Sequence, residues 1–132
     1  MNKEEYKARN EQFMADIARQ EGVELIGGGI YYRGEENGEG DKTANMRSVV
    51  TCHYRGSLIS GKVFDDSWQR NCPEAFRVAD LINGFSAALC KMRKGDRWTV
   101  YIPWDKAYGK RGCPGIPPYS TLIFEIHLIS IN

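Results

Sequence analysis

The side chains that most often carry catalysis or bind metals are few and scattered in this chain. Two histidines, His53 and His127, and four cysteines stand at spacings that match no metal-binding or nucleophile motif. The run Gly27–Gly29 is glycine-rich like a phosphate-binding loop, but no helical pattern follows it. The sequence therefore predicts no metal, nucleotide or other cofactor, and it argues against hydrolysis, group transfer and redox chemistry.

Aromatic side chains are more abundant in this chain than histidines and cysteines. The chain holds three Trp, seven Tyr and five Phe, and most of these rings lie between Tyr54 and Phe124. A ring-lined slot suits a reaction that needs little acid–base chemistry, such as rotation about the bond before a proline, which takes tens to hundreds of seconds unaided. Removing water disfavours the planar, charge-separated form of an amide relative to a twisted one. The abundance of rings is compatible with such a reaction but does not by itself show that the protein catalyses it.

The length and charge suit a single globular domain. The chain has 132 residues, and 18 basic against 17 acidic residues leave a net charge of +1. This balance predicts no nucleic-acid partner and no membrane partner, because proteins that bind either one typically carry an excess of basic residues. The first residues contain no signal-peptide core, which predicts a cytoplasmic protein, or a periplasmic or otherwise exported one if the start is trimmed. Four free thiols are expected, at Cys52, Cys72, Cys90 and Cys113.

Hydrophobic periodicity predicts the elements that position these residues. Residues 3–20 form an amphipathic helical pattern that Asn2 can cap, and this arm either packs on the domain or meets another chain, packing being preferred. Short strands are expected at 23–26 and 30–33, followed by a polar surface loop at 34–46. Alternation predicts further strands after Arg47, around Trp98 and after Leu122, with both histidines on outward faces.

One more helix is predicted between these strands. Apolar residues from Leu81 to Met92 recur on one helical face, and Gly95 closes the pattern. Several antiparallel strands packed on one short helix define an α+β architecture.

Local strings in residues 23–132 resemble those of the FKBP-type peptidyl-prolyl cis-trans isomerases, and in particular of their bacterial members. In family order they are VVTCHYRG (49–56), GKVFDDS (61–67), INGF (82–85), AYG (107–109), GCPGIPP (112–118) and TLIF (121–124). The resemblance implies a five- or six-stranded antiparallel sheet wrapped around one short helix. It makes residues 22–132 the isomerase domain and residues 1–21 an added N-terminal helical arm; similar arms occur in bacterial relatives that dimerise or act as chaperones.

The resemblance also implies the site residues. Asp65 matches the acidic residue that lies beside the twisted amide, and Tyr108 matches the tyrosine whose hydroxyl group donates to the substrate carbonyl. These two are the expected catalytic residues. The expected substrate-binding residues match the family's proline slot and its flanking loop: Tyr54, Phe64, Phe76, Leu81, Ile82, Phe85, Cys113, Ile116 and Phe124.

Plainer interpretations exist for several of these residues. Asp65, in the string FDDS, is also typical of an Asx turn, and Tyr108 of an ordinary turn aromatic. Phe85 stands where the family most often has tryptophan, and Cys113 where many members have histidine. Because Phe85 replaces the usual tryptophan, a non-catalytic function of the same pocket is kept as an alternative.

The expected function is peptidyl-prolyl cis-trans isomerisation, acting on Xaa-Pro bonds in unfolded or flexible protein segments during folding. The alternative is a non-catalytic peptide-binding or chaperone module that uses the same pocket. The resemblance further implies tacrolimus-like macrolides as pocket ligands, and a homodimer through the N-terminal helix as the alternative to its packing on the domain.

Overall fold

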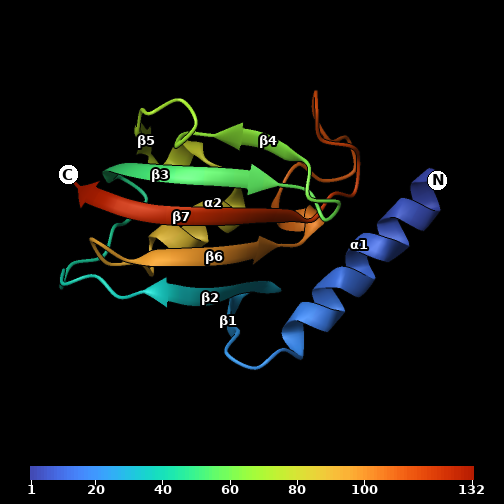
Figure 1. Ribbon diagram of the computed structural model, residues 1–132, viewed down its shortest axis with the longest axis horizontal. Helices are drawn as coiled ribbons and strands as arrows, with labels where there is room; N and C mark the ends of the chain where they lie inside the picture. Colours follow the sequence, from blue (N-terminus) through green and yellow to red (C-terminus); the bar gives the residue numbers. More distant parts are fainter.

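A seven-stranded antiparallel sheet forms the body of the protein (Figure 1). The structure is a computed structural model that describes residues 1–132. The sheet order is β1-β2-β6-β7-β3-β4, and β5 also pairs with β3. The α+β class is confirmed, with more strands than the five or six expected because short segments also pair. The strands are β1 (Glu24–Gly27), β2 (Ile30–Glu36), β3 (Val49–Ser57), β4 (Val63–Asp66), β5 (Glu74–Arg77), β6 (Arg97–Ile102) and β7 (Leu122–Ile131).

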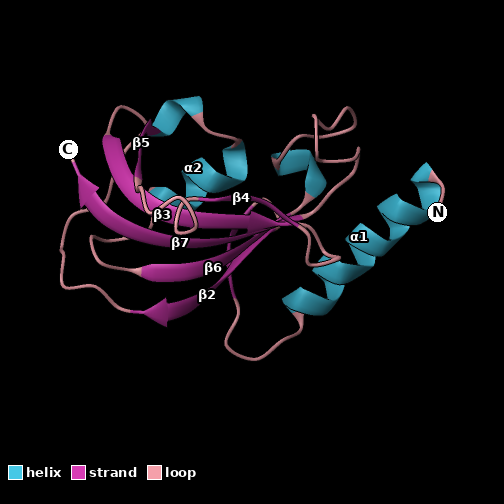
Figure 2. Ribbon diagram, turned by 45° about the horizontal axis from the view of Figure 1, so that its top comes forward, coloured by secondary structure: helices cyan, strands magenta, loops and turns pink.

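Alternate side chains of the central strands make the core. Helix α2 (Asn83–Leu89) covers one face of the sheet (Figure 2), and the strand residues that point toward it are buried. These residues follow the predicted period of two. They are Val50, Cys52 and Tyr54 on β3, Trp98, Val100 and Ile102 on β6, and Leu122, Phe124, Ile126 and Leu128 on β7.

Helix α2 is shorter than the apolar pattern from Leu81 to Met92 predicts. Leu81 and Ile82 precede it in an extended conformation, with ψ angles of 162° and 151°. Met92 is fully buried beyond the end of the helix, in the turn that leads to β6. These residues are apolar because they contact the core or a cavity, so the stripe of apolar residues does not mark the ends of the helix.

The predicted polar loop at 34–46 is partly ordered by the core. Strand β2 continues to Glu36, and the backbone N–H of Gly38 donates to Asp96 Oδ1 at 2.7 Å. A Cβ atom at Gly38 would lie 2.1 Å from the carbonyl oxygen of Lys94, so only glycine allows this approach. Ala44 is buried as well. The glycine-rich, polar composition of this segment is therefore due to close backbone packing as well as to exposure.

Helix α1 (Lys3–Ala18) runs diagonally past one end of the sheet (Figures 1 and 2). Its predicted cap is confirmed, because the N–H of Glu5 donates to Asn2 Oδ1 at 2.8 Å. Asn10 is fully buried, and its Oδ1 accepts the N–H of Thr121 at 2.8 Å. Tyr6 adds a hydroxyl contact of 2.7 Å to Ser120. The arm therefore packs on the domain, at the segment that enters β7.

The opposite face of the sheet is polar. His53 on β3 and His127 on β7 are directly opposite each other in the strand register, and both are half-buried. The ring of His53 stacks on Trp68 at a centroid distance of 5.3 Å, and its Nδ1 lies 2.7 Å from Ser67 Oγ. The outward placement predicted for the histidines is confirmed, and all four cysteines are free. Neither helix has the length and apolar character that a membrane span requires.

Candidate functional site

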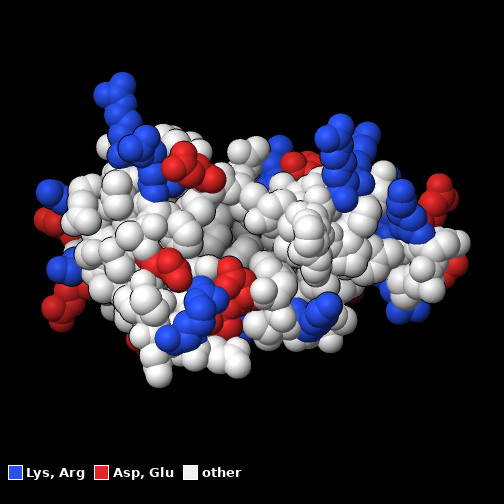
Figure 3. Space-filling view, turned by 90° about the horizontal axis from the view of Figure 1, so that it is seen from above, with Lys and Arg blue, Asp and Glu red and all other residues white.

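A small cavity of about 250 Å³ lies at the N-terminal end of α2. It is smaller than the ~300–1,000 Å³ of sites that take drug-sized ligands, which suits one or two side chains of a peptide. Figure 3 shows a face of the molecule that is hollowed near its middle, with acidic and basic side chains around the hollow. The lining residues of the cavity are Tyr54, Phe64, Asp65, Phe76, Asp80, Leu81, Ile82, Phe85, Tyr108 and Phe124.

Five rings form the apolar wall of this cavity. Phe85 is buried and contacts Phe124 edge to face, with ring centroids 4.9 Å apart. Tyr54 lies 5.6 Å from Phe76 and 5.9 Å from Phe85 between centroids, and Phe64 stands perpendicular to Phe124 at 5.7 Å. These tilted and edge-to-face contacts fix the ring orientations, so the wall is largely formed before any ligand arrives.

Gly56 on β3 makes room for two of the rings. A Cβ atom at this position would lie 2.5 Å from the ring of Phe64 and 2.7 Å from that of Phe124. Real Cβ contacts are not that short, so any other residue here would displace the rings. The glycine of the string VVTCHYRG is therefore a packing requirement of the cavity.

A carboxylate is held at the rim by two donors. Asp65 accepts a 2.6 Å hydrogen bond from the Tyr54 hydroxyl group and a 2.6 Å ion pair from Arg70. Burial alone would raise the pKa of Asp65, but the bonds from Tyr54 and Arg70 outweigh it and hold that pKa below its ordinary value. Burial, together with the bond to Asp65, raises the pKa of Tyr54 to about 12. At neutral pH the carboxylate is therefore ionised and Tyr54 remains a donor.

Tyr108 presents a free hydroxyl group on the other side of the cavity. Tyr108 comes shortly after the 3-10 turn Trp104–Lys106. The next residue is Gly109, which has φ +68°. The hydroxyl group of Tyr108 makes no hydrogen bond within the chain, and 41% of the residue is exposed. Burial of the ring, with smaller contributions from Cys113 and Asp65, raises the pKa of Tyr108. The group is a protonated donor that is available to a ligand.

The structure brings most of the expected site residues together and separates two of them. Both catalytic candidates and seven of the substrate-binding candidates line the cavity. Cys113 and Ile116 do not line it; they form the ends of a turn in which the N–H of Ile116 donates to the Cys113 carbonyl at 2.9 Å. Pro114 and Gly115, with φ +85° at the glycine, give this turn the features of type II. The turn directs both residues to a neighbouring cavity.

Geometry resolves the plainer interpretation of Asp65 as the residue of an Asx turn. The Asx turn belongs to Asp66, whose Oδ1 accepts the N–H groups of Trp68 at 3.0 Å and Gln69 at 3.2 Å. Asp65 makes no such turn and faces the cavity. Phe124 is a core ring and Phe76 is a partly buried ring packed against the core, and both line the cavity.

Arg70 and Asp80 were not expected from the sequence. Arg70 lies in the exposed turn between β4 and β5 and reaches Asp65, Tyr54 and Glu74 at the same time. No periodicity marks a loop residue of this kind. Asp80 is the last residue of the 3-10 turn Val78–Asp80, which precedes α2. Its position next to Leu81 in the sequence was the only feature that could have marked it as a cavity residue.

Comparison with known proteins agrees with this fold. The family model described as FKBP-type peptidyl-prolyl cis-trans isomerase matches residues 40–129. FkpA of Escherichia coli K12 is 37% identical over 126 residues, which are 96% of this chain and 46% of that protein. The macrophage infectivity potentiator of Trypanosoma cruzi is 41% identical over 121 residues, covering 91% of this chain and 62% of that protein. The crystal structure of a peptidyl-prolyl cis-trans isomerase from Pseudomonas syringae superimposes with a TM-score of 0.91 at 34% identity, covering 100% of this chain and 97% of that one.

The molecule is thus a small α+β domain, an antiparallel sheet packed on a short helix with a ring-lined cavity at the start of that helix. The chain belongs to the family of FKBP-type peptidyl-prolyl cis-trans isomerases. It spans about half the length of the curated relatives it matches.

Proposed function

We propose that this chain is a peptidyl-prolyl cis-trans isomerase that acts on Xaa-Pro bonds in flexible protein segments during folding. The observation that carries the proposal is the ring-lined cavity of about 250 Å³ with one free hydroxyl donor, Tyr108, and one fixed carboxylate, Asp65. Family membership supports the same activity.

The chemistry follows from the properties of the amide. Resonance imposes a barrier of ~18–20 kcal/mol on rotation about the peptide bond, and the planar form is the more polar one. A proline ring held against Phe85 and Phe124 would bring its amide out of water, which raises the energy of the planar form relative to the twisted one. No bond is broken in the reaction, so no nucleophile is needed.

Two polar groups orient the substrate in this proposal. The hydroxyl group of Tyr108 donates to the carbonyl oxygen of the residue before proline. Asp65 lies beside the twisting amide, and its bonds to Tyr54 and Arg70 prevent it from moving away. The remaining cavity residues, Leu81 and Ile82 among them, shape the entrance.

NMR exchange spectroscopy on a short proline-containing peptide tests the proposal. Catalytic amounts of the wild-type chain are expected to speed cis–trans exchange, and the double variant Asp65→Leu with Tyr108→Phe is expected to lose most of that effect. Lys94→Gln, far from the rings, is the matched control and keeps the wild-type rate. Peptide binding at the ring cavity without any acceleration would contradict the proposal and favour the non-catalytic peptide-binding alternative.

Macrolide binding is a further part of the proposal. Tacrolimus-like macrolides are expected to compete with proline peptides for the ring cavity, with an affinity that depends on the floor residue Phe85. Phenylalanine gives a shallower floor than the usual tryptophan and lacks an indole N–H. Titration of wild type and Phe85→Trp with tacrolimus measures this; tighter binding by the tryptophan variant is expected, and equal affinities would contradict it.

The role of residues 1–21 as an arm outside the isomerase domain of residues 22–132 is also proposed. The contacts of Asn10 and Tyr6 support packing on the same chain. Self-association through α1 is the alternative to this packing, and sedimentation velocity of the full chain over a range of concentrations tests it. A monomer at all concentrations would contradict the homodimer.

The compartment is proposed from the thiols and the relatives. Four free cysteines favour a reducing compartment such as the cytoplasm. A relative from Legionella longbeachae is named an outer membrane protein, which favours export as the alternative. Fractionation of cells that express the protein naturally decides between the two.

A further inference from the structure

A second cavity lies next to the ring-lined one and carries an unbalanced positive charge. It measures about 510 Å³ and is lined by Tyr6, Leu58, Ser60, Lys62, Arg111, Cys113, Gly115, Ile116, Pro117 and Pro118. Lys62 and Arg111 are its only charged residues, and both are exposed. Neither takes part in any ion pair of the structure. Two unpaired cations beside an apolar floor are suited to an anionic group on an otherwise apolar chain.

Two segments of the chain run from the lining of one cavity to the lining of the other. Phe64 lines the ring cavity and Lys62 the second one, and two residues span at most about 7 Å of backbone. In the other segment, Tyr108 lines the ring cavity and Arg111 the second one, within one turn in which the N–H of Gly112 donates to the Tyr108 carbonyl at 3.2 Å. An extended peptide advances about 3.3 Å per residue, so two or three residues separate the cavities.

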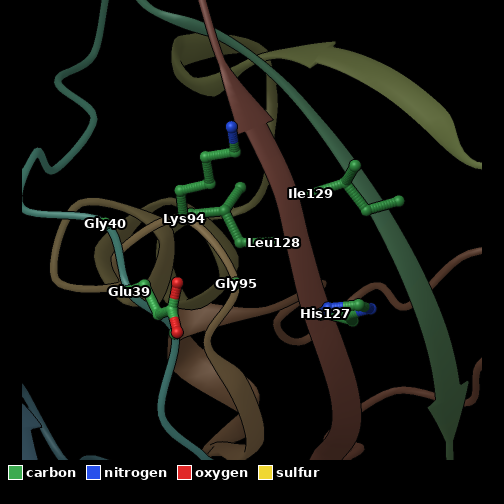
Figure 4. Close-up of a pocket in the computed structure, with 8 residues that line it drawn as sticks. Glu39, Gly40, Lys94, Gly95, His127, Leu128 and Ile129 are labelled. Carbon is green, nitrogen blue, oxygen red and sulfur yellow. The ribbon is translucent and has the colours of Figure 1, made fainter.

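The cavity at the far end of the sheet lacks this imbalance. It measures about 520 Å³, and both Lys94 and Glu39 line it (Figure 4). In that view Lys94 and Leu128 lie on one side of β7 and His127 on the other. Opposite charges at one site give no preference for an anionic ligand, and none of the rings that would hold a proline is present there.

We propose that the substrate segment continues from the ring cavity into the cavity of Lys62 and Arg111, which selects a glutamate or aspartate near the proline. The inference rests on the proposed isomerase function and names its substrate class: Xaa-Pro segments with an acidic residue about two positions from the proline. The floor formed by Leu58 and Ile116 contacts the aliphatic part of that segment. Cys113 and Ile116 therefore contribute to substrate binding outside the ring cavity.

Two pairs of peptides test the inference. In one pair Glu or Gln stands two positions before the proline, and in the other pair two positions after it; kcat/KM for isomerisation is measured at low salt. Because exposed ion pairs are individually weak, one of the pairs should show a Glu preference of about twofold or more. That preference should shrink at high salt, since the charges are exposed. Equal rates in both pairs would overturn the inference.

Variants assign the preference to the two cations. In Lys62→Gln with Arg111→Gln the Glu-to-Gln ratio should approach one, and in Lys62→Glu with Arg111→Glu a Lys-containing peptide should become preferred over its Gln counterpart. Lys94→Gln is the matched control and should keep the wild-type ratio. A Glu preference that persists in the double variants would overturn the inference.

Failure of the acidic-residue inference can be distinguished from failure of the isomerase proposal. If no peptide is isomerised, that proposal fails, and the same peptides are titrated into the protein by NMR. Tighter binding of Glu peptides by wild type than by the Gln double variant would then support the acidic-residue site, and equal binding would overturn it.

Discussion

Asp65 and Asp66 are adjacent on β4, yet their carboxylates serve opposite sides of the strand. Asp65 accepts from Tyr54 and Arg70 at the rim of the ring cavity, whereas Asp66 accepts from Arg55 and from the backbone of the following turn. Side chains alternate between the faces of a strand, so one residue closes the turn while its neighbour is left for the site. Each carboxylate is fixed by its own donors.

The stability of the protein is expected to depend on Asp65 at acidic pH. Its pKa is lowered in the folded state, so its contribution is present above the pKa of the unfolded chain, about 3.9, and is lost as the pH falls through the lower folded-state pKa. Urea unfolding from about pH 6 down to about pH 2.5 should show a steeper loss of stability for wild type than for Asp65→Asn. Parallel curves would contradict the assigned bonds to Tyr54 and Arg70.

Tyr108→Phe is expected to slow isomerisation without unfolding the protein. The substitution removes one hydrogen bond to a neutral carbonyl, a contribution of about 0.5–1.5 kcal/mol, so kcat/KM should fall by about two- to tenfold. The hydroxyl group has no partner within the chain, so the thermal midpoint should stay unchanged. An unchanged kcat/KM would remove Tyr108 from the catalytic residues.

Gly56→Ala is expected to damage the ring cavity and the stability together. The added methyl group would overlap the rings of Phe64 and Phe124, and overpacking of this kind costs about 1–3 kcal/mol. The matched control is Gly34→Ala on β2, where an added Cβ meets nothing within 4 Å. Thermal unfolding of both variants measures the difference; equal midpoints would show that the rings can move aside.

Asn10→Ala is expected to release the segment that enters β7. It removes the acceptor of the buried Thr121 N–H, which costs about 1–3 kcal/mol when left unpaired. Hydrogen exchange at the Thr121 amide should accelerate in this variant. Asn2→Ala removes only the cap of α1, about 0.5–2 kcal/mol, and should leave the Thr121 amide protected. Equal protection in the two variants would contradict the role given to Asn10.

The sheet could be predicted from sequence because its signal is local. Val50, Cys52 and Tyr54 alternate with polar residues, and the same period in β6 and β7 places the core face correctly. The ends of α2 could not be predicted, because residues such as Leu81 and Met92 are apolar for reasons of cavity lining and core packing. Asn10 was missed although it lies three and four residues from Phe13 and Met14, on the same helical face.

The ring cavity was predicted through family strings, and the rest of the site depends on folding. Arg70 reaches Asp65 only because the turn after β4 brings it back, and no pattern in the sequence encodes that distance. Cys113 and Ile116 match family positions, but the turn through Pro114 and Gly115 gives them a different cavity. Local strings identify residue types, whereas the direction of a loop depends on contacts far along the chain.

Strand β4 has a consequence for the behaviour of the protein at high concentration. It is the last strand on its side of the sheet, so one of its edges is open beside a cavity proposed to hold extended chains. Open edges invite strand-to-strand polymerisation. β4 is only four residues long, its pairing with β3 has a register shift, and Asp65 and Asp66 fill half of it. A short, irregularly paired and negatively charged edge of this kind is a poor template for another strand, which is expected to limit self-polymerisation.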